Sequence, residues 1–313
     1  MFKSGYVSLV GRTNVGKSTL LNALTGEKVA IATNKPQTTR TAIKAILNSD
    51  DYQIIITDTP GIHKPKTKLS EAMLDTSYKM LNDSDVVLFL VEVEKIKNIN
   101  DLEDEALINR IVGPGDKLIV ERLNQIKKPV ILVINKIDLI SKEELIKFIK
   151  AYSSMYDFKA VVPVSSEKKK GLDDLIKEVL NYLPEGPKYY QDDEYTDQTV
   201  RSLSEEIIRE KLLKFLQDEV PHGLYVEISK FQERKTTKGE DIYDVEATIN
   251  CLKESHKGII IGKGGTLLKK IGTYARQDIE DMLGTRVNLK LWVKVKENWQ
   301  DNQALINDKF KLK

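Results

Sequence analysis

The chain has 313 residues, of which 31% are charged and 41% hydrophobic, and a formal net charge of +2. This composition is typical of a soluble globular protein, excludes disorder over most of the chain and, at this length, predicts two domains. The single cysteine, Cys251, excludes an internal disulfide and a cysteine-based zinc site. Apolar runs such as residues 86–91 are far shorter than the roughly 20 residues that cross a bilayer, and residues 1–10 lack a signal-peptide core. We therefore expect a cytoplasmic protein.

Short apolar runs alternate with amphipathic or polar stretches over the first half of the chain. The runs are YVSLV (6–10), QIIIT (53–57), VVLFLV (86–91), VILVI (130–134) and AVVPV (160–164). Apolar runs of this length are typical of parallel strands that helices cover on both faces. They predict an α/β domain with a doubly wound, mostly parallel sheet over residues 1–183.

The first apolar run leads into a glycine-rich turn, GRTNVGKS, at residues 11–18. The turn satisfies G-x-x-x-x-G-K-[ST] and opens the helix-forming run TLLNALTG. Its glycines allow backbone N–H groups to converge on phosphate oxygens, while Lys17 adds a positive charge and Ser18 a hydroxyl oxygen for Mg²⁺. The pattern predicts a triphosphate site; a purely structural glycine turn is the alternative.

The motif DTPG, residues 58–61, follows the second apolar run. Asp58 at a strand end can anchor Mg²⁺ through water, and the N–H of Gly61 can contact a γ-phosphate. Taken alone, the motif also suits any proline-containing turn. The highly charged residues 92–128, with GPG at 113–115, carry no function that we can assign from the sequence.

The motif NKID, residues 135–138, follows the run at 130–134. Asp138 can accept two hydrogen bonds from the N1–H and N2–H₂ edge of guanine, which adenine does not offer. Because a buried carboxylate left unpaired costs about 1–3 kcal/mol or more, this residue would make the site selective for guanine. SSE at 165–167 follows the last run and is placed to support the base, although a plain loop explains it equally well in isolation.

Residues 184–198 contain two prolines, a glycine and an acidic cluster without an apolar period, so we interpret them as a linker. The order of the elements changes after it. A helical pattern (199–219) is followed by two strand-like runs (224–231 and 243–252), a glycine-interrupted helical stretch (256–284), the run 286–295 and a short final helix. This order predicts an α+β domain over residues 199–313.

The glycine-interrupted stretch contains a second glycine turn, GKGG, at residues 262–265. No Lys-Ser pair follows its last glycine, so it is not a second nucleotide loop. It resembles the GXXG loop of KH modules, which clamps about four nucleotides of single-stranded RNA between two helices. The position of the strands before the loop fits the type II KH topology. The apolar residues Ile259, Ile260 and Leu268 could face the bases, although Ile260 is better explained as a core residue.

The charge of the second domain favours the RNA interpretation. Between Lys257 and Lys296 there are nine basic residues against three acidic ones, so this segment is +6 while the remainder of the chain is −4. Solvated helix faces also carry lysines, but a positive cluster beside a GXXG loop is typical of a protein that binds a phosphate backbone.

The four motifs of the first domain stand in the order found in the translation-factor class of small GTPases, which this domain resembles. With the KH-like domain, nearly the whole chain resembles the Era family of bacterial GTPases. The segments that carry this resemblance are GRTNVGKSTLLNAL, PQTTR, DTPGIH, NKID and HKGIIIGKGGTLLKKIG. The resemblance implies a GTPase that binds single-stranded small-subunit ribosomal RNA near its 3′ end and assists maturation of the 30S subunit. GTP would favour the RNA-binding arrangement, and hydrolysis would release the protein.

The resemblance also implies how the nucleotide is handled. A switch threonine, placed at Thr39 with Thr38 as the second choice, completes a Mg²⁺ shell. Ile62 stands where many GTPases have a catalytic glutamine, and Asn14 resembles the asparagine that holds K⁺ in hydrophobic-substituted relatives. Hydrolysis is therefore expected to be slow and to rise in K⁺ over Na⁺. We interpret His63 as a switch residue rather than a base.

The expected sites are as follows. The catalytic residues are Lys17, Thr39, Gly61 and Asn14; the metal ligands are Ser18, Thr39 and Asp58 for Mg²⁺ and Asn14 for K⁺. The nucleotide-binding residues are Gly11, Asn14, Val15, Gly16, Lys17, Ser18, Thr19, Asp58, Gly61, Asn135, Lys136, Asp138, Ser165 and Ser166. The RNA-binding residues are Lys257, Gly258, Ile259, Ile261, Gly262, Lys263, Gly264, Gly265, Leu268 and Lys269.

Three alternatives stay open at the sequence level. A P-loop kinase would use ATP, and NKID argues against it. An RNA-binding scaffold with a vestigial nucleotide site would bind RNA regardless of GTP. A related GTPase could act on the large subunit or on tRNA. The protein is expected to be a monomer, and the family resemblance implies peripheral contact with the inner membrane, although the sequence offers no amphipathic anchor for it.

Overall fold

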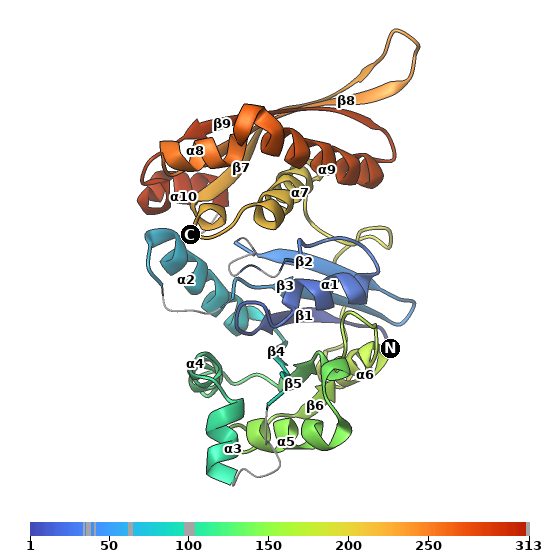
Figure 1. The fold of residues 1–313 in the computed structure, drawn as a ribbon. Coiled ribbons are helices and arrows are strands. Elements are labelled where there is room, and N and C mark those ends of the chain that lie inside the picture. The colour runs from blue at the N-terminus through green and yellow to red at the C-terminus, as the bar shows by residue number, and fades with distance from the viewer. Residues whose placement is uncertain (34, 36–38, 41, 62–64, 97–103, 311–313) are drawn as a thin grey trace.

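The computed structural model describes residues 1–33, 35, 39–40, 42–61, 65–96 and 104–310. Figure 1 shows two parts of the chain that lie against each other, an N-terminal part built around one sheet and a C-terminal part built around another. The predictions for Thr38, Ile62 and His63 concern positions outside the described residues.

The N-terminal part has a six-stranded sheet in the order β2-β3-β1-β4-β5-β6. Its strands are β1 (Lys3–Val10), β2 (Ile43–Asn48), β3 (Tyr52–Asp58), β4 (Val86–Glu92), β5 (Val130–Asn135) and β6 (Ala160–Pro163). All neighbouring strands are parallel except β2 and β3, which are antiparallel. The predicted fold class, a P-loop GTPase domain with a mostly parallel sheet, is confirmed. The antiparallel edge strand β2 was not among the predicted strands.

Helices cover both faces of this sheet, and the side chains of β4 show how. Val86, Leu88 and Leu90 face one buried cluster, whereas Val87 and Phe89 face the other. The first cluster lies under α1 (Lys17–Thr25) and α6 (Leu172–Tyr182), and the second under α2 (Lys68–Asp83), α3 (Asp104–Ile111), α4 (Pro114–Leu123) and α5 (Lys142–Ser153). Burial on both faces explains why these strands are continuously apolar.

The segment predicted as a linker lies along the edge strand β2. The backbone N–H of Ile46 donates to the carbonyl of Tyr195 at 3.0 Å, and Thr196 bridges Ala45 in antiparallel fashion. The side-chain amide of Asn48 donates to three linker carbonyls, including that of Glu194 at 2.9 Å. The linker is therefore hydrogen-bonded to the outer strand over much of its length.

The C-terminal part has the element order of a type II KH domain, helix-strand-strand-helix-helix-strand, and this prediction is confirmed. The elements are α7 (Val200–Phe215), β7 (Leu224–Lys235), β8 (Asp241–Cys251), α8 (Glu254–Ile261), α9 (Thr266–Leu283) and β9 (Arg286–Val295), followed by α10 (Gln303–Phe310). β7 and β8 are antiparallel, and β8 and β9 are parallel. Ile260 is fully buried in the core of this domain, together with Ile271 and Ile279.

The two parts share a buried apolar cluster. Leu69 and Met73 of α2 pack with Tyr225, Trp299 and Ile306 of the C-terminal part. Figure 1 shows α2 lying beside α10, at the contact between the two parts. Among the helices of the described residues, none has the length and apolar character required to cross a membrane.

Candidate functional site

The glycine-rich turn predicted to hold phosphates connects the end of β1 to the start of α1. Gly16 has a φ of 101° and precedes the first residue of the helix. A Cβ at Gly16 would overlap the side-chain amide of Asn135, and a Cβ at Gly11 would overlap the carbonyl oxygen of Leu90. Both glycines are therefore required by close packing, and the turn presents its backbone N–H groups at the helix N-terminus, where anions are favoured.

Lys17 is buried, and its side chain curls back over the turn. Its Nζ donates to the carbonyl oxygens of Gly11 at 3.1 Å and Arg12 at 2.9 Å. Burial lowers the pKa of Lys17, and the charge of Asp58 counteracts this effect. A cation held by two neutral carbonyls is poised to move to an anionic partner, because pairing with an anion offsets its desolvation.

Three oxygen-bearing side chains from separate elements meet beside this lysine. Asp58, at the end of β3, accepts hydrogen bonds on Oδ2 from the hydroxyls of Ser18 at 2.9 Å and Thr39 at 3.0 Å. The two hydroxyl oxygens lie 3.2 Å apart. Burial raises the pKa of Asp58, and Lys17 with the two hydroxyls opposes this.

The oxygen group fits a magnesium ion. Among the residues that the structure describes, Oδ1 of Asp58 is buried without a hydrogen-bond partner. Among the described residues, no group of three or more His, Cys, Asp or Glu side chains could hold a metal ion. The potential metal ligands at this site are therefore one carboxylate and two hydroxyl groups. Mg²⁺ is commonly bound by one or two carboxylates with phosphate oxygens and waters completing its shell.

Gly61 lies against the phosphate turn. A Cβ at this position would lie 2.8 Å from Cγ2 and 3.0 Å from the backbone nitrogen of Thr13. Only glycine therefore allows the segment after β3 to approach the turn this closely.

Asn135 acts as a brace between the phosphate turn and the loop after β6. It is buried, and its Nδ2 donates to the carbonyl of Val15 at 2.9 Å. Its Oδ1 accepts from the backbone N–H of Ser166 at 3.0 Å and from the Ser166 hydroxyl at 2.9 Å. Asn135 therefore fixes the spacing between the phosphate turn and the loop after β6.

The carboxylate of Asp138 is exposed and orientated by Ser165, whose Oγ donates to Oδ1 at 2.5 Å. This hydrogen bond lowers the pKa of Asp138. Lys136 has a left-handed backbone and directs its Nζ to the carbonyl of Asn14 at 3.1 Å and to the carboxylate of Glu92. The loop after β5 is thereby tied to the phosphate turn.

These residues surround one cleft of about 270 Å³. Its lining includes Asn14, Gly16, Lys17, Ser18, Thr19, Thr39, Gly61, Asn135, Lys136, Asp138, Ser165 and Ser166. Of the predicted nucleotide-binding residues, Gly11, Val15 and Asp58 do not line it, because Gly11 and Val15 pack inside the turn and Asp58 lies behind the two hydroxyls. Asn14 has a φ of 69°, a left-handed conformation that asparagine tolerates better than most residues.

Sequence reasoning missed a second brace of the phosphate turn. The side chain of Arg12 leaves the turn and donates from Nε to Oδ1 of Asp116 at 2.9 Å, and the hydroxyl of Tyr152 donates to Oδ2 at 2.9 Å. Asp116 is fully buried, which raises its pKa against the opposing charge of Arg12. A Cβ at Gly115 would lie 2.7 Å from Cδ of Arg12. The motif GPG at residues 113–115, to which the sequence analysis assigned no function, therefore leaves space for the side chain of Arg12. Its glycines were the only feature of the sequence that indicated a close approach at this position.

The second glycine turn is built differently. Gly262, Gly264 and Gly265 have φ values of 73°, 60° and 77°. A Cβ at Gly264 or Gly265 would have nothing within 4 Å, and Lys263 between the glycines is exposed. The turn is an open, positively charged loop at the start of α9.

A groove of about 390 Å³ runs from this turn between α9 and β9. Its lining residues are Gly265, Leu268, Lys269, Gly272, Thr273, Arg276, Leu289 and Leu291. Lys257, Gly258, Ile259 and Ile261 belong to α8 and are not among the lining residues, although the side chain of Ile259 is 49% exposed. Of the predicted RNA-binding residues, only Gly265, Leu268 and Lys269 line this groove, together with Arg276 and two leucines of β9.

Family models match both parts of the chain. Residues 6–136 match the model described as a 50S ribosome-binding GTPase, and residues 219–300 match the KH domain. The chain is 50% identical over 305 residues to GTPase Era of Caldanaerobacter subterraneus subsp. tengcongensis, which covers 97% of this chain and 96% of the relative. It is 51% identical over 309 residues to GTPase Era of Clostridioides difficile (strain 630), covering 98% of each.

Solved structures agree over the whole chain. A crystal structure of Era in complex with MgGDPNP and nucleotides 1506–1542 of 16S ribosomal RNA matches with a TM-score of 0.89 and 36% identity over 99% of both chains. Aquifex aeolicus Era bound to GDP and AlF4⁻ matches with a TM-score of 0.88 and 36% identity.

Fold and site together define a P-loop GTPase joined to a KH domain. The chain belongs to the Era family of GTPases, because relatives of that name are 50% and 51% identical to it over nearly its full length.

Proposed function

We propose that this protein is a GTP-operated switch that binds small-subunit ribosomal RNA near its 3′ end and assists maturation of the 30S subunit. The observation that carries the proposal is the oxygen group of Ser18, Thr39 and Asp58, with its unpartnered carboxylate oxygen, beside the buried Lys17. A relative that was solved with both MgGDPNP and 16S ribosomal RNA supports the pairing of the two ligands.

In this proposal, the backbone N–H groups of the phosphate turn bind the α- and β-phosphates. Lys17 exchanges its two carbonyl partners for the β- and γ-phosphate oxygens. Ser18 and Thr39, with Asp58 behind them, would hold Mg²⁺, which when bound would neutralise charge on the phosphates. The N–H of Gly61 donates to the γ-phosphate, and this contact would be lost after hydrolysis.

Asp138 is proposed to select guanine. Its carboxylate is ionised at neutral pH, since the hydrogen bond from Ser165 lowers its pKa, and it lines the same cleft as Lys17. It can accept two hydrogen bonds from guanine and none of that kind from adenine. Ser166 and Asn135 keep the loop that carries Ser165 at a fixed distance from the turn.

We propose that Asn14 binds K⁺ and that the cation supplies part of the electrostatic help for hydrolysis. Asn14 lines the cleft next to the phosphate turn, in the conformation described above. The rate of GTP hydrolysis should then be several-fold higher in K⁺ than in Na⁺, and the difference should disappear in Asn14→Ala. Equal rates in the two salts would remove Asn14 from the mechanism.

The RNA strand is proposed to pass over the open glycine turn and along the groove beside α9. Lys263 and Lys269 would meet phosphates, while Leu268 and the exposed Ile259 would face bases. GTP in the N-terminal cleft would favour this binding and GDP would weaken it.

Nucleotide competition tests the first half of the proposal. A fluorescent GTP analogue should be displaced by GTP and GDP and resist ATP, and Lys17→Ala should lower the hydrolysis rate by about 100-fold or more. Lys142→Ala, an exposed lysine at the start of α5, is the matched control and should hydrolyse GTP normally. Displacement by ATP as efficient as by GTP would favour a kinase instead.

RNA binding tests the second half. An RNA with the sequence of the small-subunit 3′ end should bind more tightly to protein loaded with a non-hydrolysable GTP analogue than to protein loaded with GDP. Crosslinks to ribosomal subunits should map to residues 258–296. Identical affinity in both nucleotide states would identify the protein as an RNA-binding scaffold, and crosslinks elsewhere would overturn the proposed surface.

We further propose that the protein acts as a monomer in the cytoplasm. The peripheral contact with the inner membrane that the family resemblance implies can be tested by sedimentation with vesicles of bacterial lipids, loaded with either nucleotide.

A further inference from the structure

Two consecutive residues reach into different parts of the molecule. Thr39 donates its hydroxyl to Asp58 at the proposed metal site. Arg40, the next residue, is 4% exposed and extends into the C-terminal domain. Because the Cα atoms of consecutive residues are held about 3.8 Å apart, a displacement of Arg40 limits the positions that Thr39 can take.

The hydrogen bonds and the cation–π contact that the structure gives for the Arg40 guanidinium are with the KH-containing part. Nη1 donates to the carbonyl of Leu224 at 2.5 Å, and Nη2 donates to the carbonyl of His222 at 3.0 Å. The guanidinium also lies 5.5 Å from the centre of the Trp299 ring. Two diverging hydrogen bonds and a cation–π contact fix both the position and the direction of the side chain.

This anchor is unusual in its charge. Among the described residues no carboxylate lies within 4.0 Å of Arg40, so carbonyl dipoles and an aromatic face compensate the buried cation. Burial lowers the pKa of Arg40 to about 9, with Arg209 adding to the effect and Glu206 opposing it, so the side chain stays charged at neutral pH. A buried cation with only neutral partners lowers the stability of the fold, so a role in positioning would explain its presence here.

We propose that Arg40 is a positioning residue for GTP hydrolysis, through which the KH domain holds Thr39 at the metal site. This inference rests on the proposed function, because it needs Thr39 to act on the bound nucleotide. According to this proposal, the C-terminal domain affects GTP hydrolysis, in addition to responding to the bound nucleotide. Both directions are expected, because a coupling free energy between two binding sites is reciprocal.

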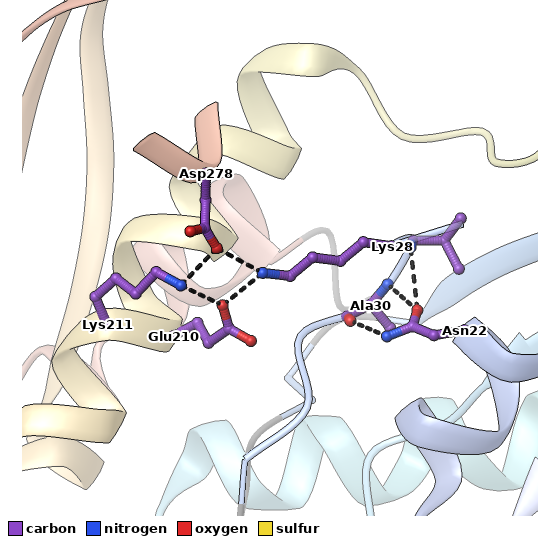
Figure 2. Close-up of polar contacts among 7 residues, drawn as sticks. Asn22, Lys28, Ala30, Glu210, Lys211 and Asp278 are labelled. Atoms are coloured by element: carbon purple, nitrogen blue, oxygen red, sulfur yellow. Dashed lines mark hydrogen bonds and ion pairs between the residues drawn. The ribbon is translucent and has the colours of Figure 1, made fainter. Parts of the chain in front are cut away.

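A second bridge between the same two parts provides the control (Figure 2). Nζ of Lys28 lies 2.8 Å from both Oε2 of Glu210 on α7 and Oδ2 of Asp278 on α9, and Lys211 completes the cluster. The loop that carries Lys28 is fixed to α1, because Oδ1 of Asn22 accepts the N–H groups of Val29 at 3.0 Å and Ala30 at 2.9 Å. Lys28 thus joins the two domains without lining the nucleotide cleft.

The test compares Arg40→Met with Lys28→Met in the full-length protein. If Arg40 positions Thr39, Arg40→Met should lower kcat for GTP about 10-fold, because a small misplacement of a site residue has effects of this size or larger. The KM for GTP and the affinity for GDP should change less than kcat, since the phosphate turn is intact. Lys28→Met should stay within about 2-fold of the wild type, since Lys28 does not line the nucleotide cleft and Lys211 still pairs with both carboxylates.

A double-variant cycle separates positioning from general stability. If Arg40 acts through Thr39, adding Arg40→Met to Thr39→Ala should lower kcat no further. Additive losses would overturn the proposal, as would an unchanged kcat in Arg40→Met or an equal loss in Lys28→Met.

A further variant guards against misfolding of Arg40→Met. Trp299→Phe removes part of the ring beneath the guanidinium from the opposite domain, and it should lower kcat in the same direction by a smaller factor. An unaltered kcat in this variant would contradict the proposal. Failure of the inference is distinct from failure of the proposed function, because the latter would show as absent GTP hydrolysis in the wild type.

Discussion

The two glycine turns of this chain look alike in sequence, and they work in opposite ways. In both turns a glycine in the left-handed region, Gly16 or Gly265, immediately precedes the first residue of a helix. Around Gly16 protein atoms leave no room for a methyl group, whereas a Cβ at Gly265 would point into open space. The first turn is enclosed by protein atoms, and the second is packed against Leu267 at Gly262 but open to solvent at Gly264 and Gly265.

The difference matches the ligands proposed for each turn. A nucleotide has a fixed size, so the protein can surround it with braces such as Asn135 and the pair of Arg12 and Asp116. A single-stranded RNA continues in both directions, so its binding loop must stay open at each end. In this chain the phosphate turn is closed around Gly16, whereas the loop proposed to bind RNA is open at Gly264 and Gly265.

The largest effect should come from Gly16→Ala. The new methyl group would overlap Asn135 in addition to straining a φ of 101°, so the affinity for GTP should fall by at least about 100-fold. Gly26→Ala is the matched control, because its φ is 74° with nothing within 4 Å. It should reduce the free energy of unfolding by about 1 kcal/mol and leave GTP affinity unchanged. Isothermal titration with GTP measures the affinity of both variants. Equal losses of affinity in Gly16→Ala and Gly26→Ala would show that backbone strain, and not packing against Asn135, determines the effect.

A smaller effect is expected from Asp116→Asn, which keeps the shape of the brace and removes its charge. Arg12 would be left without its ion-pair partner, so the KM for GTP should rise about 10-fold while RNA binding by GTP-loaded protein is retained. Asp174→Asn serves as the control, because that carboxylate is exposed and 3.7 Å from Lys177. A lower melting temperature with an unchanged KM would show that the brace supports only the fold.

Gly264→Ala should have a moderate effect restricted to RNA. Its φ of 60° allows alanine at a cost of about 1–2 kcal/mol, and the methyl group would stand where an RNA backbone approaches. We expect about a 10-fold loss of RNA affinity with normal GTP hydrolysis. Gly239→Ala in the turn between β7 and β8 imposes similar strain at a φ of 80° away from the groove, so it should bind RNA normally. A comparable loss of RNA affinity in both variants would refute the open-loop interpretation.

The smallest effect is predicted for Lys263→Ala. Removing one phosphate contact should weaken RNA binding modestly and reduce the slope of log affinity against log salt by about 0.7, as expected for a single strand. Lys238→Ala, an equally exposed lysine in the turn between β7 and β8, should leave the slope unaltered. An unchanged slope in Lys263→Ala would place the RNA elsewhere on the domain.

Local patterns were enough to predict the class of both domains and the strand-turn-helix around Lys17. These patterns involve residues that are close together in the sequence. The apolar run that ends at Val10 predicted a buried strand, and the apolar residues around Ile260 predicted a core position, and both residues are fully buried. The edge strand β2 escaped prediction because its run, IKAILN, is short and is interrupted by Lys44. Its antiparallel pairing with β3 follows from the short turn between them.

The contacts that escaped prediction all join residues far apart in sequence. Arg12 meets Asp116 across 104 positions, and Arg40 meets Leu224 across 184. An arginine in a polar segment carries no sign of the carbonyl that it will bind, since every residue has one. Only the packing of complete elements against each other determines these partners.

The hydrogen-bonded linker limits how the KH domain can travel. With Tyr195 and Thr196 stitched to the outer strand, only the few residues up to Val200 at the start of α7 are left as a joint. A joint of so few residues restricts how far the KH domain can move away from the N-terminal part. A small tilt of the KH domain would then suffice to form or break the hydrogen bonds of Arg40 to His222 and Leu224. Signalling between the two domains would therefore require only a small change in their relative orientation.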